Sequence, residues 1–426
     1  MIKVIIVGAG WAGVAAAITA KKAGADVHLF EKTDLLLGLG NVGGIMRNNG
    51  RWTASEELME LGAGDLIKIT DKTSRHKDID FPGHKHASLY DVNLIEGEVY
   101  NYLEEMGINI YIESRVVDIE LEKSKVKGIY LSDGTYIDGD VFIETTGTTG
   151  PMGNCLRYGN GCSMCILRCP AFGPRLSISE RCGVRDIQGE RGEDELGAFS
   201  GSCKLAKESL SEEIREKLDK EGVVVLKVPE EDINYDKLGQ KVCQQYALKE
   251  FAENIVLLDT GHAKLMTSYY PLKKLRKIKG LEKVKYVDPY AGSKGNSIRY
   301  LSVAQRTNDM KVKGVDNLFC AGEKSGLFVG HTEAICTGSL AGHNAVRLVM
   351  GIPLLILPTS IAIGDLISYT NEMESTREGR KDRYTFAGSK YFARMKEQGL
   401  YTLDKEEIRN RIAKLNLRDV FSQKLV

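Results

Sequence analysis

Four cysteines lie within fifteen residues of this 426-residue chain, which has nine cysteines in all. Their spacing is Cys155-x6-Cys162-x2-Cys165-x3-Cys169, and a proline follows the last of them. Loops with C-x2-C-x3-C-P spacing hold iron–sulfur clusters, because their turns bring several thiolates onto one face of the cluster. The spacing therefore predicts a 4Fe-4S cluster bound by these four cysteines.

Other interpretations of this cysteine cluster stay open. The first gap is six residues rather than two, and the cysteine before proline often serves a different cluster, so Cys182 and Cys203 are further candidate ligands. Four thiolates also suit a structural zinc ion, and redox-active or buried free thiols need no metal. Because nine is an odd number, a fully paired disulfide framework within one chain is excluded.

A second chemical motif, Gly8-Ala-Gly10-Trp-Ala-Gly13, lies near the start of the chain. In such a motif the first glycine permits a tight turn, the second lets the backbone approach a pyrophosphate, and the third lets helix and strand pack closely. An acidic residue, Glu31, follows 18 residues after Gly13, where its carboxylate suits a ribose hydroxyl. The pattern predicts a dinucleotide site that contains Gly8, Gly10, Trp11, Ala12, Gly13, Glu31 and Lys32.

The segments around the glycine motif must hold it between a strand and a helix. Lys3–Val7 is predicted as a strand, Trp11–Ala23 as a helix and Asp26–Glu31 as a second strand. Alternation of this kind is typical of a doubly wound parallel sheet. In that arrangement the helix N-terminus offers N–H groups and a positive dipole to bound phosphates.

Later segments complete the predicted cofactor domain. From Asn109 to Ile137 short alternating segments are separated by turns, which predicts an antiparallel meander that begins with Asn109–Ile112. The meander runs into a buried strand, Asp140–Glu144. The α/β pattern then returns at Asn317–Glu323 and continues in a helix from Thr332 to Val349.

The end of the meander and the late strand distinguish FAD from NAD. These segments, with the glycine motif, resemble the FAD-binding fold of the glutathione-reductase-like flavoproteins. In that family the end of the meander contacts FAD, a late glycine–acid pair binds its ribityl and pyrophosphate region, and the next helix faces the flavin. The resemblance implies FAD as cofactor, with contacts at Val117, Thr146, Gly147, Gly322, Glu323, Thr332, Glu333 and Ala334.

Two further features lie where the flavin is expected. The loop Leu39–Gly44 is rich in glycine, and its residues Gly43 and Gly44 are candidate flavin contacts, although an ordinary surface turn is an equal interpretation. His331 lies at the start of the helix that faces the flavin. It is a weak catalytic candidate as a proton donor, and a residue that merely begins the helix is the alternative.

A closer resemblance lies between residues 317 and 370. This part of the chain is similar to the folate- and FAD-dependent tRNA uracil-5-methyltransferases in three segments: Cys320-Ala-Gly-Glu-Lys-Ser-Gly, the helix Glu333–Gly342 and the segment Leu357–Tyr369. Those enzymes are related to the GidA-like tRNA-modifying flavoproteins. The resemblance implies methylenetetrahydrofolate as carbon donor, a nicotinamide reductant and tRNA as substrate. That family carries a catalytic cysteine after the first acidic residue, whereas Gly38–Gly50 contains none. The resemblance therefore implies FAD binding and the family's architecture for this chain, whereas it does not support methyl transfer.

Charge and hydropathy restrain the choice of partners. Lys and Arg number 58, as do Asp and Glu, so the simplest argument for a nucleic-acid partner is absent. The stretch Arg377–Lys396, with seven basic and two acidic residues, is either a phosphate-contacting face or a solvated charged helix.

Glycines interrupt the apolar run Val4–Ala20, and Leu348–Pro358 is too short to span a bilayer. We expect a cytoplasmic protein with a small-molecule or protein electron donor or acceptor, no membrane partner, and RNA as a less favoured partner.

These features combine into an α/β fold class with four parts. The FAD-binding domain, a parallel sheet plus meander, occupies 1–150 and returns at 301–358; an inserted α+β domain with the cysteine cluster occupies 151–300, and a helical C-terminal region 359–426. The leading functional prediction is an FAD-dependent oxidoreductase that passes electrons between flavin and an iron–sulfur cluster. The alternatives are a flavin-dependent RNA-modifying enzyme and a flavin-stabilised interaction protein that holds structural zinc.

The iron–sulfur interpretation predicts a brown protein when the chain is purified without oxygen, with broad absorbance beside the flavin bands. The Cys162→Ala substitution removes one thiolate, so the broad signal should disappear while the flavin bands persist. Iron, sulfide and zinc analysis of the same preparation separates this outcome from a zinc site. A yellow anaerobic preparation without iron contradicts the prediction.

Overall fold

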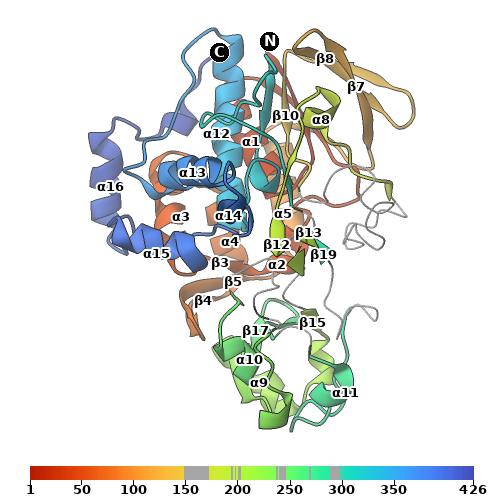
Figure 1. Cartoon of the computed structure of the whole chain (residues 1–426), viewed down its shortest axis with the longest axis vertical. Helices are drawn as coiled ribbons and strands as arrows, with labels where there is room; N and C mark the ends of the chain where they lie inside the picture. The colour runs from red at the N-terminus through yellow and green to blue at the C-terminus, as the bar shows by residue number, and fades with distance from the viewer. Residues whose placement is uncertain are drawn as a thin grey trace.

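The computed structural model describes residues 1–147, 172–192, 195–196, 198–199, 203–236, 238, 246–267, 270–287, 298–299 and 301–426. The upper part of the molecule holds both termini and the central sheet, and the described residues between 203 and 287 form a lobe below it, which we call the lower lobe (Figure 1). The predicted cluster of Cys155, Cys162, Cys165 and Cys169 lies outside the described residues.

A five-stranded parallel sheet organises the upper part. Its strand order is β21-β10-β1-β2-β6, and every neighbouring pair is parallel. The central strands are buried along most of their length, because helices cover one face and the antiparallel meander packs on the other, so their sequences are nearly continuous apolar runs. The predicted α/β fold class is therefore confirmed. The strands are β1 (Lys3–Val7), β2 (Asp26–Phe30), β6 (Asn109–Tyr111), β10 (Val141–Glu144) and β21 (Leu318–Cys320).

The meander is present, but it begins later than the sequence predicts. Asn109–Tyr111 pairs in parallel with β2 and forms the edge of the main sheet rather than the first meander strand. The alternating exposure of such a short segment fits either role, so local pattern does not separate them. The antiparallel meander contains β7 (Val116–Glu122), β8 (Lys125–Leu131) and β9 (Tyr136–Asp138).

Two long helices pack closely beside the sheet. These are α1 (Trp11–Lys22), which follows β1, and α12 (His331–Val349), which follows β21. A Cβ atom on Gly338 or on Gly342 would overlap a backbone carbonyl of α1, so both glycines permit this contact. The Thr19 hydroxyl on α1 donates a hydrogen bond to the Ser339 carbonyl on α12 (3.0 Å). Both helices begin at the carboxyl edge of the sheet.

The segment between β2 and β6 forms a helical layer and a small antiparallel sheet of order β3-β5-β4. This small sheet adjoins the lower lobe, because Ile45 and Leu89 share a hydrophobic core with Val256 and Leu258 of the lobe. The elements are α2 (Gly40–Gly43), β3 (Ile45–Met46), α3 (Gly50–Glu60), α4 (Asp65–Thr73), β4 (Ser74–Phe81), β5 (His84–Tyr90) and α5 (Ile95–Glu105).

The lower lobe contains its own antiparallel sheet, of order β15-β18-β17-β16. One face of this sheet packs on helix α9 and on residues 270–287, and the other packs on the small β3-β5-β4 sheet. Among the described residues from 236 to 253, Glu250–Glu253 form a short α-helix. The elements are β15 (Cys203–Leu205), α9 (Glu212–Glu221), β16 (Val223–Lys227), α10 (Glu250–Glu253), β17 (Asn254–Asp259), β18 (Ala263–Leu265) and α11 (Leu272–Leu275).

Short elements join the lower lobe to the central sheet. They are α8 (Ile178–Arg181), β11 (Ile187–Gln188), β12 (Glu190–Gly192), β13 (Glu195–Leu196), β14 (Ala198–Phe199), β19 (Ile298–Arg299) and β20 (Ser302–Val303). The domain boundaries predicted from the sequence stay predictions.

The C-terminal region is helical, as predicted, and lies against α3 and α12 (Figure 1). Its helices are α13 (Ala362–Met373), α14 (Arg377–Arg380), α15 (Ser389–Glu397) and α16 (Lys405–Lys414). In the parts of the chain that the structure describes, no helix has the length and apolar character needed to cross a membrane.

The Gly338→Ala substitution tests the close packing of α1 and α12. Alanine favours a helix over glycine by about 0.5–1 kcal/mol, but overpacking a tight contact costs about 1–3 kcal/mol. Because the new Cβ would overlap the Ala12 carbonyl, we expect the free energy of unfolding to fall. Gly97→Ala on α5 is the matched control, since a Cβ there meets no atom within 4 Å, and it should raise stability. Chemical denaturation measures both, and a Gly338→Ala protein as stable as the wild type contradicts this packing.

Candidate functional site

A cavity with about 1130 Å³ of empty space, partly open to solvent, lies at the carboxyl edge of the parallel sheet. In open α/β sheets this edge is where ligands bind. Its walls come from segments far apart in the sequence: the β1–α1 turn, the ends of β2 and β10, the start of β7, the β21–η6 turn and the start of α12. The short 3-10 helix η6 spans Gly322–Lys324.

The three glycines of the β1–α1 turn have different roles. Gly8 has a φ of +102°, and a Cβ there would lie 2.5 Å from the Thr145 carbonyl oxygen. A Cβ on Gly13 would overlap the Gly8 carbonyl, so this glycine lets α1 pack against β1. Around Gly10, by contrast, no protein atom lies within 4 Å of a built Cβ. The space beside Gly10 is therefore available to a ligand, and the α1 N-terminus next to it favours phosphate groups.

Glu31 connects the end of β2 to this turn. Its Oε2 accepts a hydrogen bond from the Ala9 N–H (2.8 Å), and its Oε1 accepts one from the Thr33 N–H (2.9 Å). The side chain is mostly buried and lines the cavity. The carboxylate thus fixes the glycine turn while it faces the place where a ribose is expected.

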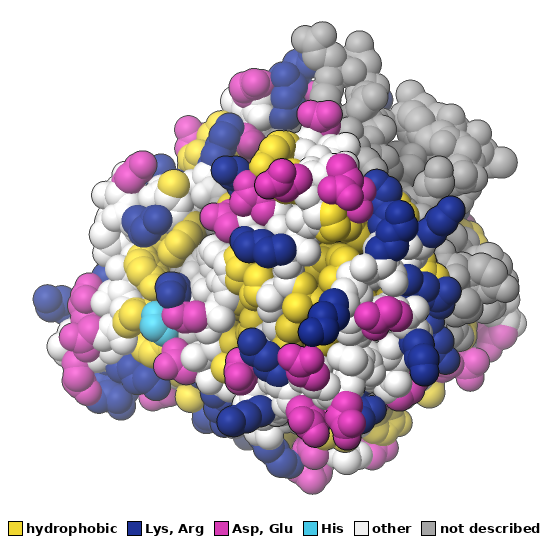
Figure 2. Space-filling model, turned by 90° about the horizontal axis from the view of Figure 1, so that it is seen from below, with side chains coloured by type: hydrophobic (Ala, Val, Ile, Leu, Met, Phe, Trp, Pro, Cys, Tyr) yellow, Lys and Arg dark blue, Asp and Glu magenta, His cyan; other side chains and the backbone are white. Residues whose placement is uncertain are grey.

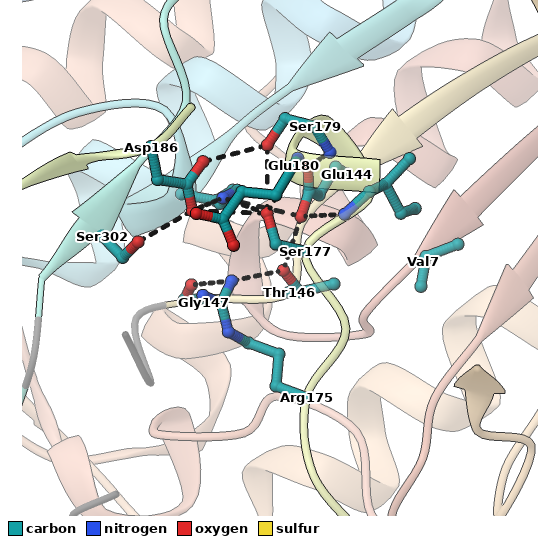
Figure 3. A network of polar contacts seen from close by, with 12 residues as sticks. Val7, Glu144, Thr146, Gly147, Arg175, Ser177, Ser179, Glu180, Asp186 and Ser302 are labelled. Carbon is teal, nitrogen blue, oxygen red and sulfur yellow. Dashed lines mark hydrogen bonds and ion pairs between the residues drawn. The ribbon is translucent and has the colours of Figure 1, made fainter. Parts of the chain in front are cut away.

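Figure 3 shows a buried polar network behind the cavity, built on two acidic side chains. The Glu144 carboxylate, at the end of β10, accepts hydrogen bonds from the Ile178 N–H (2.9 Å) and the Ser179 N–H (2.8 Å). Lys324 is fully buried, forms an ion pair with Asp186 and lies 3.7 Å from Glu144. Burial by itself would raise the pKa of Asp186, but the charges of Lys324 and Arg175 lower it, so the carboxylate stays ionised.

Arg175 brings this network to the cavity wall. Its Nη1 donates hydrogen bonds to the Thr146 hydroxyl (3.0 Å) and to the Gly147 carbonyl (3.2 Å), as Figure 3 shows. The guanidinium therefore places a permanent positive charge beside the end of β10, where it suits an anionic or polar group of a ligand. Sequence reasoning missed Arg175, because no motif marks an arginine that tertiary contacts bring to the site.

His331, the first residue of α12, also lines the cavity. Its ring packs against Trp11, with ring centroids 5.4 Å apart, and its Nδ1 forms a hydrogen bond with the Tyr90 hydroxyl (3.2 Å). The Tyr90 hydroxyl donates its single proton to the Gly40 carbonyl (2.7 Å), so it accepts the hydrogen bond from His331 Nδ1. Burial raises the pKa of Tyr90 above the usual range, so it stays protonated. His331 and Tyr90 thus form a fixed polar pair at the start of α12.

The glycine-rich loop packs behind His331. A Cβ on Gly43 would overlap the His331 ring, and one on Gly44 would overlap Thr260, so neither glycine lines the cavity. Two lysines of the lower lobe hold this loop from outside. The Lys204 ammonium donates to the Asn41 carbonyl and the Lys264 ammonium to the Val42 carbonyl, both at 2.8 Å.

Most of the residues predicted to bind FAD line the cavity, and some do not. Glu333 is buried and forms an ion pair with Arg51 (3.1 Å). The Thr332 hydroxyl is buried without a hydrogen-bond partner among the described residues. The predicted residues that line the cavity are Gly8, Gly10, Trp11, Ala12, Glu31, Lys32, Thr146, Gly147, Gly322, Glu323 and Ala334; Gly13, Gly43, Gly44, Val117, Thr332 and Glu333 do not.

The cysteines that the structure describes lie away from the cavity. Cys182, Cys203, Cys320 and Cys336 are at least partly buried, and none of these four lines it. Burial raises the pKa of Cys182 to about 12, which leaves its thiol un-ionised at neutral pH. Within the described ranges, no group of three or more metal-ligating side chains could hold a metal ion.

The basic stretch Arg377–Lys396 is not one helix, because residues 381–388 separate α14 from α15. Arg383 is buried and donates to the Glu190 carbonyl (2.8 Å). Several other charges are neutralised, as in the ion pairs of Lys390 with Asp382 (2.5 Å), Arg394 with Asp365 (2.8 Å) and Arg380 with Glu190 (3.3 Å). This surface therefore offers less free positive charge than its sequence suggests.

Comparison with known proteins gives a family match and two kinds of relative. The family model described as "Glucose inhibited division protein A" matches residues 3–257 and 236–353. The tRNA uridine 5-carboxymethylaminomethyl modification enzyme MnmG of Chlorobaculum tepidum is 40% identical over 96 residues, which is 22% of this chain and 14% of that protein. The methylenetetrahydrofolate–tRNA-(uracil-5-)-methyltransferase TrmFO of Bacillus subtilis is 35% identical over 95 residues, 22% of this chain and 21% of that protein. These matches therefore span less than a quarter of either relative.

A solved structure extends the likeness to the whole fold. Aquifex aeolicus GidA, in its form II crystal, superposes with a TM-score of 0.64 and 18% identity, and the match covers 99% of this chain and 74% of that one. The form I crystal gives a TM-score of 0.60 at 16% identity. At this level of identity the likeness shows a shared fold.

The Gly10→Ala substitution tests whether the space beside the glycine turn holds the expected FAD. Since a Cβ there meets no protein atom within 4 Å, the ligand-free protein should keep its stability within about 0.5 kcal/mol. A methyl group at the point of pyrophosphate approach should weaken FAD binding about 10-fold or more, or about 1.4 kcal/mol. Calorimetric titration with FAD measures this, with Gly97→Ala as the control. Equal FAD affinity in the two variants would place the cofactor elsewhere.

Proposed function

The chain belongs to the glucose inhibited division protein A family, and from this premise we propose that it is a flavin-dependent enzyme that modifies uridine in tRNA. The observation that carries the proposal is the cavity at the carboxyl edge of the sheet, where the glycine turn, Glu31 and the start of α12 meet. The names of both relatives refer to tRNA and to position 5 of uridine or uracil. The proposed substrate is therefore a tRNA uridine, modified at C5.

The lining of the cavity fits FAD. The space beside Gly10 and the α1 N-terminus would hold the pyrophosphate, and Glu31 would hold the ribose of the adenosine. Arg175 supplies a positive charge beside the end of β10, and Gly322 and Glu323 also line the cavity. When bound, FAD supplies two-electron chemistry, by which a hydride is taken from one molecule and given to another.

His331 is the proposed proton donor at the flavin end of the cavity. Its ring is fixed between Trp11 and Tyr90, so its orientation does not depend on the substrate. An imidazole can hold or release a proton near neutral pH, which proton transfer to or from a uridine ring requires. The Tyr90 hydroxyl keeps the ring oriented through Nδ1.

The proposal does not include methyl transfer through a cavity thiol. The loop Gly38–Gly50 contains no cysteine, and none of the four described cysteines lines the cavity. Thiol chemistry of the kind that the sequence resemblance implies would need a cysteine from outside the described residues. We therefore propose that this chain modifies uridine by flavin-dependent chemistry in which none of the four described cysteines takes part.

Electron transfer to an iron–sulfur cluster is a second proposal. It rests on the spacing of Cys155, Cys162, Cys165 and Cys169 alone, since these residues lie outside the described ranges. Such a cluster would exchange single electrons with a flavin, which passes electrons one or two at a time. The spectrum of the anaerobic protein decides this proposal independently of tRNA modification.

Mass spectrometry of tRNA nucleosides tests the proposed function. Deletion of the gene in its own organism should remove one C5-modified uridine and leave its precursor. The wild-type chain and Gly97→Ala should restore the modification, whereas Gly10→Ala should restore less of it, because its FAD affinity is reduced. An unchanged nucleoside profile after deletion would overturn tRNA uridine as the substrate.

A further inference from the structure

The lower lobe carries a dense group of positive charges, which we call the basic segment and define as residues 271–287. It contains seven basic residues and a single acidic one, Glu282, although the whole chain has no net charge. All seven basic side chains are exposed. They are Lys273, Lys274, Arg276, Lys277, Lys279, Lys283 and Lys285.

Buried apolar residues orient these cations outward. Leu275, Leu281 and Val284 are fully buried in the core of the lower lobe, and Ile278 is 9% exposed. Backbone hydrogen bonds fix the turns between them, from the Ile278 N–H to the Leu275 carbonyl (3.1 Å) and from the Leu281 N–H to the Ile278 carbonyl (2.9 Å). Because the apolar side chains face inward, the cations that alternate with them project together into solvent.

The basic segment has few acidic partners. Lys274 forms an ion pair with Asp232, and within the described ranges none of the other six cations forms one. The C-terminal stretch differs, because Arg380, Lys390 and Arg394 are paired there with acidic side chains. Figure 2, which looks onto the lower lobe, shows Lys and Arg side chains gathered on the right of this face. Cations without an acidic partner can bind an incoming anion without first breaking an ion pair, although Arg276 donates to the Val284 carbonyl (2.9 Å).

We propose that the basic segment binds the sugar–phosphate backbone of the RNA substrate, an inference that rests on the proposed function. Closely spaced cations displace the counterions that surround a nucleic acid, and this release drives binding. A membrane surface fits less well. Helices that lie on membranes insert an apolar face into lipid, whereas Leu275, Ile278, Leu281 and Val284 are already buried in the lobe.

The basic segment is joined to the cofactor cavity through β15. The Val287 N–H donates to the Lys204 carbonyl (2.9 Å), and the Ala206 N–H donates to the Lys285 carbonyl (3.0 Å). The Lys204 ammonium in turn donates to the Asn41 carbonyl in the loop behind His331. An RNA held on the basic segment is therefore held at a fixed position relative to the cavity.

A triple variant, Lys277→Gln/Lys279→Gln/Lys283→Gln, tests this surface in the full-length protein. Binding of a tRNA transcript is measured by fluorescence anisotropy at several salt concentrations. Each lost phosphate contact reduces the slope of log K against log salt by about 0.7–0.9, so the slope should become shallower by about 2–3. Affinity at low salt should fall by about 10-fold or more, while FAD affinity and thermal stability stay unchanged, because the three side chains are exposed.

The matched control is Arg377→Gln/Lys381→Gln/Lys390→Gln, which removes the same charge from the C-terminal stretch and should leave tRNA affinity within about 2-fold, because these cations serve acidic partners. If wild-type protein binds tRNA and the control variant loses binding while the lobe variant keeps it, the inference is wrong and the proposed function stands. If wild-type protein does not bind tRNA at low salt, both fail. Phosphatidylserine vesicles are the third arm, and loss of vesicle binding with unchanged tRNA binding would identify a membrane surface instead.

Discussion

The close packing of α1 against β1 and against α12 is the constraint on which the cofactor cavity depends. Gly13 lets α1 approach the strand before it, and Gly338 and Gly342 let α12 approach α1. Both helices therefore begin at the same edge of the sheet, and their N-termini meet at one cavity. A larger side chain at any of these three positions would push an element aside, and the cavity walls would move with it.

Buried charges fix the other walls. Lys324, Asp186 and Glu144 join the β21–η6 turn, the segment after α8 and the end of β10, while Arg51 and Glu333 join α3 to α12. Taking such charges out of water is costly, so buried ion pairs of this kind contribute little to net stability. Removing one partner of such a pair strongly lowers the stability of the fold, however, because the other charge is left buried and unpaired. These networks thus fix the relative positions of segments that are more than a hundred residues apart.

The lower lobe holds the loop behind His331 in place, but its described residues do not form part of the cavity wall. Lys204 and Lys264 contact the loop that packs behind His331, and no lower-lobe residue lines the described cavity. The lobe also carries seven exposed basic residues and one acidic residue at residues 271–287. A chain of zero net charge can therefore carry a local excess of positive charge, because the balancing acidic residues lie in other segments of the sequence.

The sequence by itself determined the local chemistry of the cofactor site. Gly8, Gly10 and Gly13 between an apolar strand and a helix, with Glu31 at the end of the next strand, predict the nucleotide-binding turn because each requirement is set within about twenty-five residues. Only the tertiary structure decided which distant residues complete the cavity. Arg175 reaches the wall through Thr146 and Gly147, and Glu333 turns to Arg51 rather than to the cavity, because partners remote in sequence fix these side chains. For the same reason Asn109–Tyr111 became a sheet edge: three alternating residues fit either sheet, and pairing with β2 decided between them.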